Sequence, residues 1–190
     1  MEIRLINNQT ALIKGKKESL LVNPSTEIVK SNKSNSRVIL ITEKALDQFG
    51  LDGEKVIIRG AGEYEVGGLE VIGISGGEGQ TIYVVNVDGV NIGIIGDLEA
   101  ELNDKKIERV DEVDVLMVSL GKVSNKIILQ WAKKWGANYL VPMNYGGKEE
   151  VIKAFLDEAD REDLEPIEVL KVDKDNLPEG MEIVVLKKQE

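Results

Sequence analysis

The chain of 190 residues contains no histidine and no cysteine. Histidine is the commonest protein ligand for zinc and the usual general base near neutral pH, and thiolate is the other soft metal ligand. The two absences therefore exclude imidazole and thiolate from the chemistry of this protein. The lack of cysteine also leaves no disulfides, which favours a cytoplasmic location.

Long apolar runs are missing as well. The longest, Val38-Ile39-Leu40-Ile41 and Ile92-Gly93-Ile94-Ile95, have the length of strands and are far too short to cross a bilayer. The segment Met1–Leu5 has no basic stretch followed by a long apolar one. We therefore expect neither a signal peptide nor a membrane as partner.

Positive charge is scarce, because 24 lysines and arginines face 34 aspartates and glutamates, for a formal net charge of −10. Nonspecific binding to nucleic acid depends on neutralising phosphates, so nucleic acid is not an expected partner. Lysines do gather at Lys14-Gly15-Lys16-Lys17 and at Lys133-Lys134. Both groups lie among turn or amphipathic residues, and we interpret them as solvated surface.

The first half of the chain is predicted to consist mainly of strands joined by tight turns. The alternation and the turn residues predict strands over 3–6, 10–14, 19–22, 37–42, 56–58, 69–74, 81–87 and 90–95. A short helix is predicted over 43–49. Asp88-Gly89 is a strong hairpin signal between the last two of these strands.

The second half alternates between strand and helix patterns. Helices are predicted over 102–110, 124–135 and 148–159, and strands over 113–118, 139–142, 167–172 and 181–186. On the middle helix Trp131 and Trp135 recur at helical spacing, which indicates core residues rather than a stacking platform. We predict a single domain, residues 1–190, of mixed α/β type with sheets covered by helices.

Polar segments follow four of the predicted buried strands, at the place where α/β proteins usually form sites. These segments are Thr42–Gln48, Gly96-Asp97, Leu120-Gly121-Lys122 and Pro142–Gly147.

In this order, the segments resemble the landmarks of the metallo-β-lactamase superfamily, specifically its small branch of zinc-dependent hydrolases. The family's Thr-His-x-His-x-Asp-His corresponds to Thr42-Glu43-Lys44-Ala45-Leu46-Asp47-Gln48, its Gly-Asp to Gly96-Asp97, and its Pro-Met-His-Tyr to Pro142-Met143-Asn144-Tyr145. Its Gly-Glu-Tyr-Glu-Val-x-Gly is present whole at residues 62–68, and its Asp-Pro corresponds to Asn23-Pro24. The resemblance covers nearly the whole chain and implies an αββα four-layer sandwich, two mixed β-sheets flanked by helices.

The resemblance also implies a zinc site whose histidines have all been replaced. The positions of this relic metal site are Glu43, Ala45, Asp47, Gln48, Asp97 and Asn144. We therefore predict a non-catalytic pseudo-hydrolase that carries no cofactor and acts by binding a small molecule or a protein. Residues of a possible ligand cleft are Asn8, Lys44, Lys122 and Tyr145. Either lysine could neutralise the remaining carboxylates, as the metal ions do in the family.

Two other readings stay open. Glu43, Asp47 and Asp97 are oxygen donors, which suit Mn, Mg or Ca better than zinc, so the chain could be a divergent metal-dependent hydrolase. It could also be a structural subunit of an assembly. A lysine nucleophile is disfavoured, because acidic neighbours raise rather than lower a lysine pKa. The sequence identifies neither the ligand nor the oligomeric state.

Overall fold

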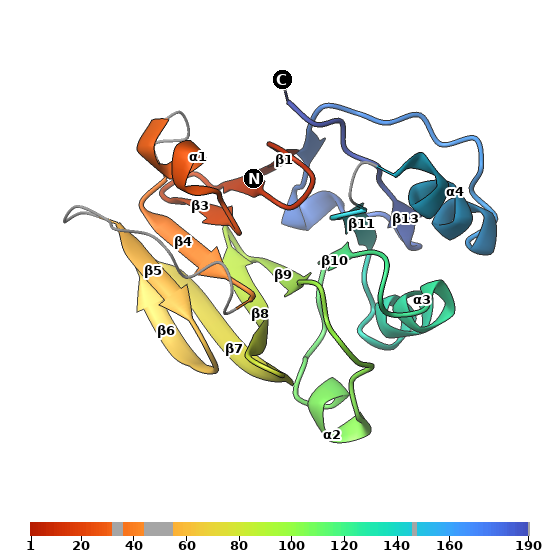
Figure 1. Cartoon of the computed structure of the whole chain (residues 1–190). Helices are drawn as coiled ribbons and strands as arrows, with labels where there is room; N and C mark the ends of the chain where they lie inside the picture. The colour runs from red at the N-terminus through yellow and green to blue at the C-terminus, as the bar shows by residue number, and fades with distance from the viewer. Residues whose placement is uncertain (32–35, 44–54, 146–147, 190) are drawn as a thin grey trace.

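The computed structural model describes residues 1–31, 36–43, 55–145 and 148–189. Two β-sheets pack against each other and helices lie on their outer faces (Figure 1). The αββα sandwich expected from the sequence is confirmed. In the described part of the chain, no helix combines the length and the apolar character needed to span a membrane.

The first sheet has six strands, in the order β12 (Leu170–Lys171), β1 (Glu2–Leu5), β2 (Ala11–Lys14), β3 (Ser19–Val22), β4 (Val38–Ile41) and β5 (Val56–Arg59). The strands β1, β2 and β3 form an antiparallel meander, whereas β3, β4 and β5 are parallel. The helix α1 (Thr26–Ser31) makes the crossover between β3 and β4.

The strand β4 shows why the sequence has an uninterrupted apolar run here. Val38 and Leu40 belong to the core between the sheets, while Ile39 and Ile41 pack against Val29 of α1 on the outer face. A parallel strand that is buried on both faces needs apolar residues at every position.

The second sheet has seven strands, in the order β13 (Glu182–Ile183), β11 (Tyr139–Met143), β10 (Val115–Ser119), β9 (Val90–Ile95), β8 (Gln80–Val87), β7 (Leu69–Gly77) and β6 (Gly62–Val66). The expected hairpin joins β8 and β9. Asp88 and Gly89 at its tip have φ values of 54° and 83°, as this tight two-residue turn requires.

The outer face of the second sheet is covered by α2 (Asp104–Ile107), α3 (Asn125–Lys134) and α4 (Glu149–Glu158) (Figure 1). Ser124 caps α3 by accepting a hydrogen bond from the backbone N–H of Ile127. Trp131 and Trp135 are buried and stacked, with ring centroids 5.9 Å apart. Their predicted role in the core is confirmed.

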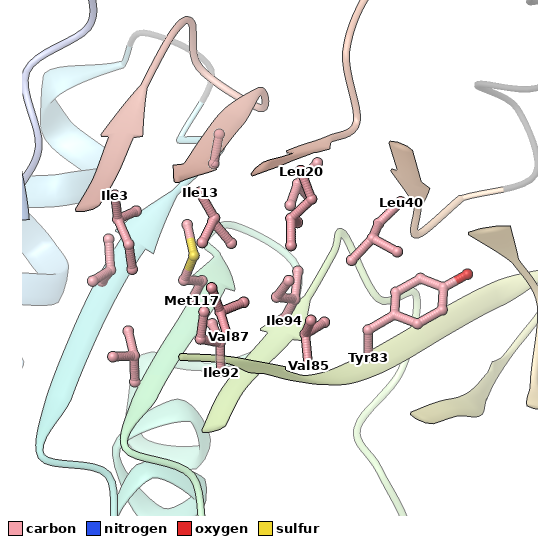
Figure 2. Close-up of a cluster of buried hydrophobic side chains, with 14 of the residues drawn as sticks. Ile3, Ile13, Leu20, Leu40, Tyr83, Val85, Val87, Ile92, Ile94 and Met117 are labelled. Carbon is pink, nitrogen blue, oxygen red and sulfur yellow. The ribbon is translucent and has the colours of Figure 1, made fainter. Parts of the chain in front are cut away.

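Figure 2 shows the core between the sheets, where side chains such as Ile13 and Leu20 meet Val85 and Ile94. A polar group, the hydroxyl of Tyr83, reaches across this interface. The buried hydroxyl of Tyr83 on β8 lies 3.0 Å from the carbonyl oxygen of Ile41 and 3.4 Å from that of Ile58, so it can donate to either strand end of the first sheet. Burial raises the pKa of Tyr83 to about 12.

Several elements differ from the sequence-based expectation. The helix α1 was not predicted, because its six residues are too few to show a periodic pattern. The predicted strands 167–172 and 181–186 shorten to β12 and β13, which lie at sheet edges and pair on one side only. The predicted helix 102–110 shortens to α2, which Asn103 caps. The predicted helix 43–49 lies outside the described residues, except that Glu43 forms a β-bridge with Gln80.

The raised pKa of Tyr83 provides a test of the contact between the two sheets. Between pH 10 and 12 the unfolded state loses the tyrosine proton while the folded state keeps it, so stability falls with pH by about 1.4 kcal/mol per unit from this group. Tyr83→Phe should remove this slope and cost about 1 kcal/mol at pH 7 through the lost hydrogen bond. Urea denaturation across this pH range measures both effects. Tyr64→Phe, which removes a hydroxyl at the surface, is the matched control and should keep the wild-type slope.

Candidate functional site

The polar segments singled out in the sequence converge at one end of the sandwich. The strands β9, β10 and β11 are parallel and in register, so the residues that follow them emerge at one edge of the second sheet. The end of β4 in the first sheet reaches the same place, since Thr42 accepts a hydrogen bond from the backbone N–H of Thr81 at 2.8 Å. We call Glu43, Asp97, Glu99 and Lys122, which meet here, the strand-end cluster.

Gly96 permits the two sheets to approach at this edge. A Cβ atom at this position would lie 2.2 Å from Oγ1 of Thr42, which is closer than any real contact. Only glycine fits, so Gly96 is required by the packing as well as being part of the Gly-Asp landmark.

Thr42 is itself held by Asn23. The Asn23 side chain accepts from the Thr42 backbone N–H at 2.9 Å and donates to its hydroxyl at 2.7 Å. The carbonyl of Asn23 accepts from the hydroxyl of Thr10 at 2.8 Å. All three residues are buried, and Asn23 adopts φ of 46°, a conformation that asparagine tolerates better than most residues. This network fixes the start of the segment that carries Glu43.

The Glu43 carboxylate is turned toward the backbone of the opposite sheet. Its Oε1 accepts a hydrogen bond from the backbone N–H of Asp97 at 3.2 Å. Burial raises the pKa of Glu43, the hydrogen bond from Asp97 opposes this, and the negative charge of Asp97 raises it further. The side chain therefore acts as a clamp between the end of β4 and the end of β9.

Lys122 places its ammonium group between two carboxylates. Its Nζ lies 3.1 Å from Oδ2 of Asp97 and 2.5 Å from Oε1 of Glu99. The hydrogen bonds to Glu99 and then to Asp97 raise the pKa of Lys122, so its charge is retained at neutral pH. Of the two lysines proposed to neutralise the carboxylates, Lys122 makes this contact and Lys44 lies outside the described residues.

Two members of this arrangement were missed by the sequence analysis. The Gln80 side chain donates to the carbonyl of Asp97 and accepts from the backbone N–H of Glu99 at 3.1 Å. Glu99 could have been predicted as a site residue from its position two residues after Asp97. Gln80 could not have been predicted from the sequence, because the antiparallel pairing of β8 with β9 brings it to the site.

The remaining candidate residues form a second polar group. The backbone N–H of Asn144, which has φ of 52°, donates to the carbonyl of Asn8. The side-chain Oδ1 of Asn8 is buried and has no hydrogen-bond partner among the described residues. Tyr145 is half-buried against the core beneath α3 and α4, and this burial raises its pKa. Within the described ranges no hydrogen bond joins these residues to the strand-end cluster.

Three further positions of the relic metal site, Ala45, Asp47 and Gln48, lie outside the described residues. Gly76 and Gly77 belong to β7, at an irregularity in its pairing with β8. There the carbonyl of Gly76 accepts from Nζ of Lys106 at 3.0 Å.

The described side chains do not fit the zinc that the resemblance implies. The chain has no imidazole and no thiolate. The Glu43 carboxylate is committed to a backbone N–H, and the Asp97 carboxylate to an ammonium group. Among the described residues, no group of three or more acidic side chains is placed to hold a metal ion. We therefore derive no chemistry through zinc.

The family assignment rests on a comparison with family models. Residues 2–144 match the model of the beta-lactamase superfamily domain, and the chain belongs to this family. No curated protein matches the sequence.

Solved structures of the metallo-β-lactamase superfamily share the fold. One is a proposed Zn-dependent hydrolase of this superfamily from Thermotoga maritima, with a TM-score of 0.76, 18% identity and coverage of 98% of both chains. Another is the metallo-β-lactamase fold protein YhfI from Bacillus subtilis, with a TM-score of 0.65, 9% identity and coverage of 98% of this chain and 97% of that one. At such identities the likeness concerns the fold alone.

The clamp made by Glu43 leads to a stability prediction. Its raised pKa means that the folded state resists ionisation of this group, so Glu43 lowers stability as the pH rises above 4.5. Glu43→Gln keeps an acceptor for the Asp97 N–H and removes that cost. The variant should therefore be more stable than the wild type at pH 7, with the difference shrinking toward pH 4, as measured by urea denaturation. Glu63→Gln, at an exposed position, should show no such pH-dependent gain.

Proposed function

We propose that this protein is a pseudo-hydrolase: a non-catalytic member of the metallo-β-lactamase superfamily that binds a small polar ligand at the strand ends. The observation that carries the proposal is the ammonium group of Lys122 between Asp97 and Glu99. In the family, the aspartate at the position of Asp97 bridges metal ions. Here its charge is neutralised by a side chain of the protein itself.

An ammonium group cannot replace the chemistry of a metal ion. It has no open coordination position, so it neither polarises a substrate oxygen as a Lewis acid nor binds a water molecule and lowers its pKa. A protonated lysine is also no nucleophile, and the two carboxylates keep Lys122 protonated. The cluster therefore stabilises the edge of the sandwich without supplying a reactive group.

The character of the ligand follows from the side chain of Asp97, which remains 26% exposed although it pairs with Lys122. A carboxylate accepts hydrogen bonds, so it favours a small molecule that donates them. The Oδ1 of Asn8 also has no hydrogen-bond partner among the described residues, but it is buried and out of a ligand's reach in this structure.

The alternative is a hydrolase that uses Mn, Mg or Ca, held by Glu43, Asp47 and Asp97. It is supported by the proximity of Glu43 and Asp97, whose charges influence each other. A titration with Mn²⁺, followed by the EPR signal of the free ion, separates the two functions. We expect the wild type to bind no stoichiometric Mn²⁺ and to hydrolyse phosphodiester and lactone substrates only at background.

A variant without Lys122 tests whether this lysine prevents Mn²⁺ from binding. Lys122→Met should free the two carboxylates, so Mn²⁺ should bind at least ten-fold more tightly than to the wild type, and Lys122→Met combined with Asp97→Asn should abolish the gain. Lys126→Met, at an exposed position on α3, is the matched control for the lost charge. Tight Mn²⁺ binding by the wild type that disappears in Asp97→Asn, together with Mn²⁺-dependent hydrolysis, would establish the alternative.

The ligand itself can be sought by NMR with a library of small polar molecules. Compounds that occupy the proposed site should shift the backbone amides of Asp97 and Asn144, and Asp97→Ala should weaken their binding. Hits that leave both amides unmoved would argue against a binding site at the strand ends.

A further inference from the structure

The strand β6 forms one edge of the second sheet (Figure 1). In the described part of the chain it pairs with β7 alone. Hydrogen-bonded and non-hydrogen-bonded pairs alternate along an antiparallel ladder, so every second residue of β6 directs its backbone N–H and C=O away from β7. None of these outward groups is hydrogen-bonded to a residue that the structure describes. The edge is therefore able to pair with a further strand.

Carboxylates line the outer face of this edge. Glu63 and Glu65 alternate along β6 with Tyr64, which packs against the core between the sheets, so both carboxylates point outward. Glu70 on β7 lies directly opposite Glu65. Like charges in directly opposed positions repel each other, and a positively charged partner would relieve this repulsion.

The chain itself does not neutralise these carboxylates. Glu63, Glu65 and Glu70 are exposed, and none of them forms an ion pair or a hydrogen bond with any residue in the described ranges. Arg59, at the end of β5, already has a partner of its own. The outer face of this hairpin therefore carries a local surplus of negative charge.

Apolar side chains beside the carboxylates are incompletely covered on both faces. On the outer face Ile72, directly opposite Glu63, is 45% exposed. On the inner face Tyr64 and Val66 pack against the core but are only half-buried. An added strand would cover apolar surface on the inner face and meet the carboxylates on the outer face.

The acidic side chains also indicate which strand this would be. Charges on an edge strand hinder pairing between two copies of a protein. An antiparallel pair of β6 strands centred on Tyr64 would bring Glu63 of one copy opposite Glu65 of the other. Charge therefore disfavours a second copy of this chain as the occupant and favours a basic strand.

We propose that β6 is a docking edge for an extended basic polypeptide segment in which lysine or arginine alternates with apolar residues. The segment adds to the second sheet beside β6. Its basic side chains pair with Glu63 and Glu65, their methylene stems cover Ile72, and its apolar side chains cover Tyr64 and Val66. Backbone hydrogen bonds supply affinity, and the alternation of side chains supplies specificity. The surface is separate from the strand-end cluster and does not depend on the function proposed for it.

The probe for this proposal is a peptide with blocked ends and the sequence Lys-Val-Lys-Val-Lys-Val. It is titrated into the ¹⁵N-labelled protein at low ionic strength. We expect saturable shifts of the backbone amides of residues 62–66. The triple substitution Glu63→Gln, Glu65→Gln and Glu70→Gln should weaken binding about five-fold or more, as expected for the loss of three exposed ion pairs.

Two controls separate strand addition from general attraction of charge. The control triple Glu150→Gln, Glu158→Gln and Glu162→Gln removes the same charge from exposed positions and should leave the affinity unchanged. A peptide of the same composition, Lys-Lys-Lys-Val-Val-Val, cannot place its lysines on one face of a strand and should bind more weakly than the alternating peptide.

Backbone pairing has a readout of its own. Two forms of the alternating peptide carry N-methyl groups either on every lysine or on every valine. Only one edge of an added strand faces β6, so one form should lose binding and the other should keep it.

Four results would overturn the proposal. They are the absence of saturable shifts in residues 62–66, equal weakening by both triple variants, equal binding of the alternating and the block peptide, and equal binding of both methylated forms. Shifts of these amides with protein concentration alone would identify a second copy as the occupant and would likewise overturn it. Asp97→Asn should leave peptide binding unchanged, which separates this test from that of the strand-end site.

Discussion

The close approach of the ends of β4 and β9 is the constraint on which the candidate site of this protein depends. At Gly96 the backbone of the second sheet passes so near the side chain of Thr42 that no Cβ atom can be accommodated. Asn23 fixes Thr42 from behind through two buried hydrogen bonds. This contact sets the position of Glu43 relative to Asp97, and Tyr83 secures the sheets a short distance inside the core.

With the sheets joined in this way, the edge of the sandwich collects carboxylates, and their repulsion must be relieved. In metal-dependent members of the family a metal ion provides the positive charge. In this chain Lys122 provides it, and the backbone N–H of Asp97 provides a further donor for Glu43. In the pseudo-hydrolase that we propose, this geometry is kept for stability, because an ammonium group cannot activate water as a metal ion does.

The strand-end cluster has a surplus of negative charge. The carboxylates of Glu43, Asp97 and Glu99 meet the single ammonium group of Lys122 there. Burial and the charge of Asp97 raise the pKa of Glu43, whereas the charge of Lys122 lowers it.

The sequence by itself determined the absence of imidazole and thiolate, the strand and helix patterns, and the hairpin at Asp88-Gly89. Each follows from composition or from a pattern that repeats over a few residues, such as the apolar run of β4. The order of the polar segments sufficed to indicate the family and its αββα sandwich. The helix α1 was missed, because six residues make fewer than two helical turns, and β12 and β13 were overextended, because these edge strands pair over two residues only.

The tertiary structure alone decided which polar groups meet. Glu43 and Asp97 are 54 residues apart, and Lys122 reaches Glu99 over 23 residues. Lys14, Glu2 and Lys171 lie side by side only because β1 pairs with β2 on one side and with β12 on the other. Such contacts depend on strand order, register and the packing of one sheet on another. None of these leaves a local trace in the sequence, since the same residues would show the same pattern beside other neighbours.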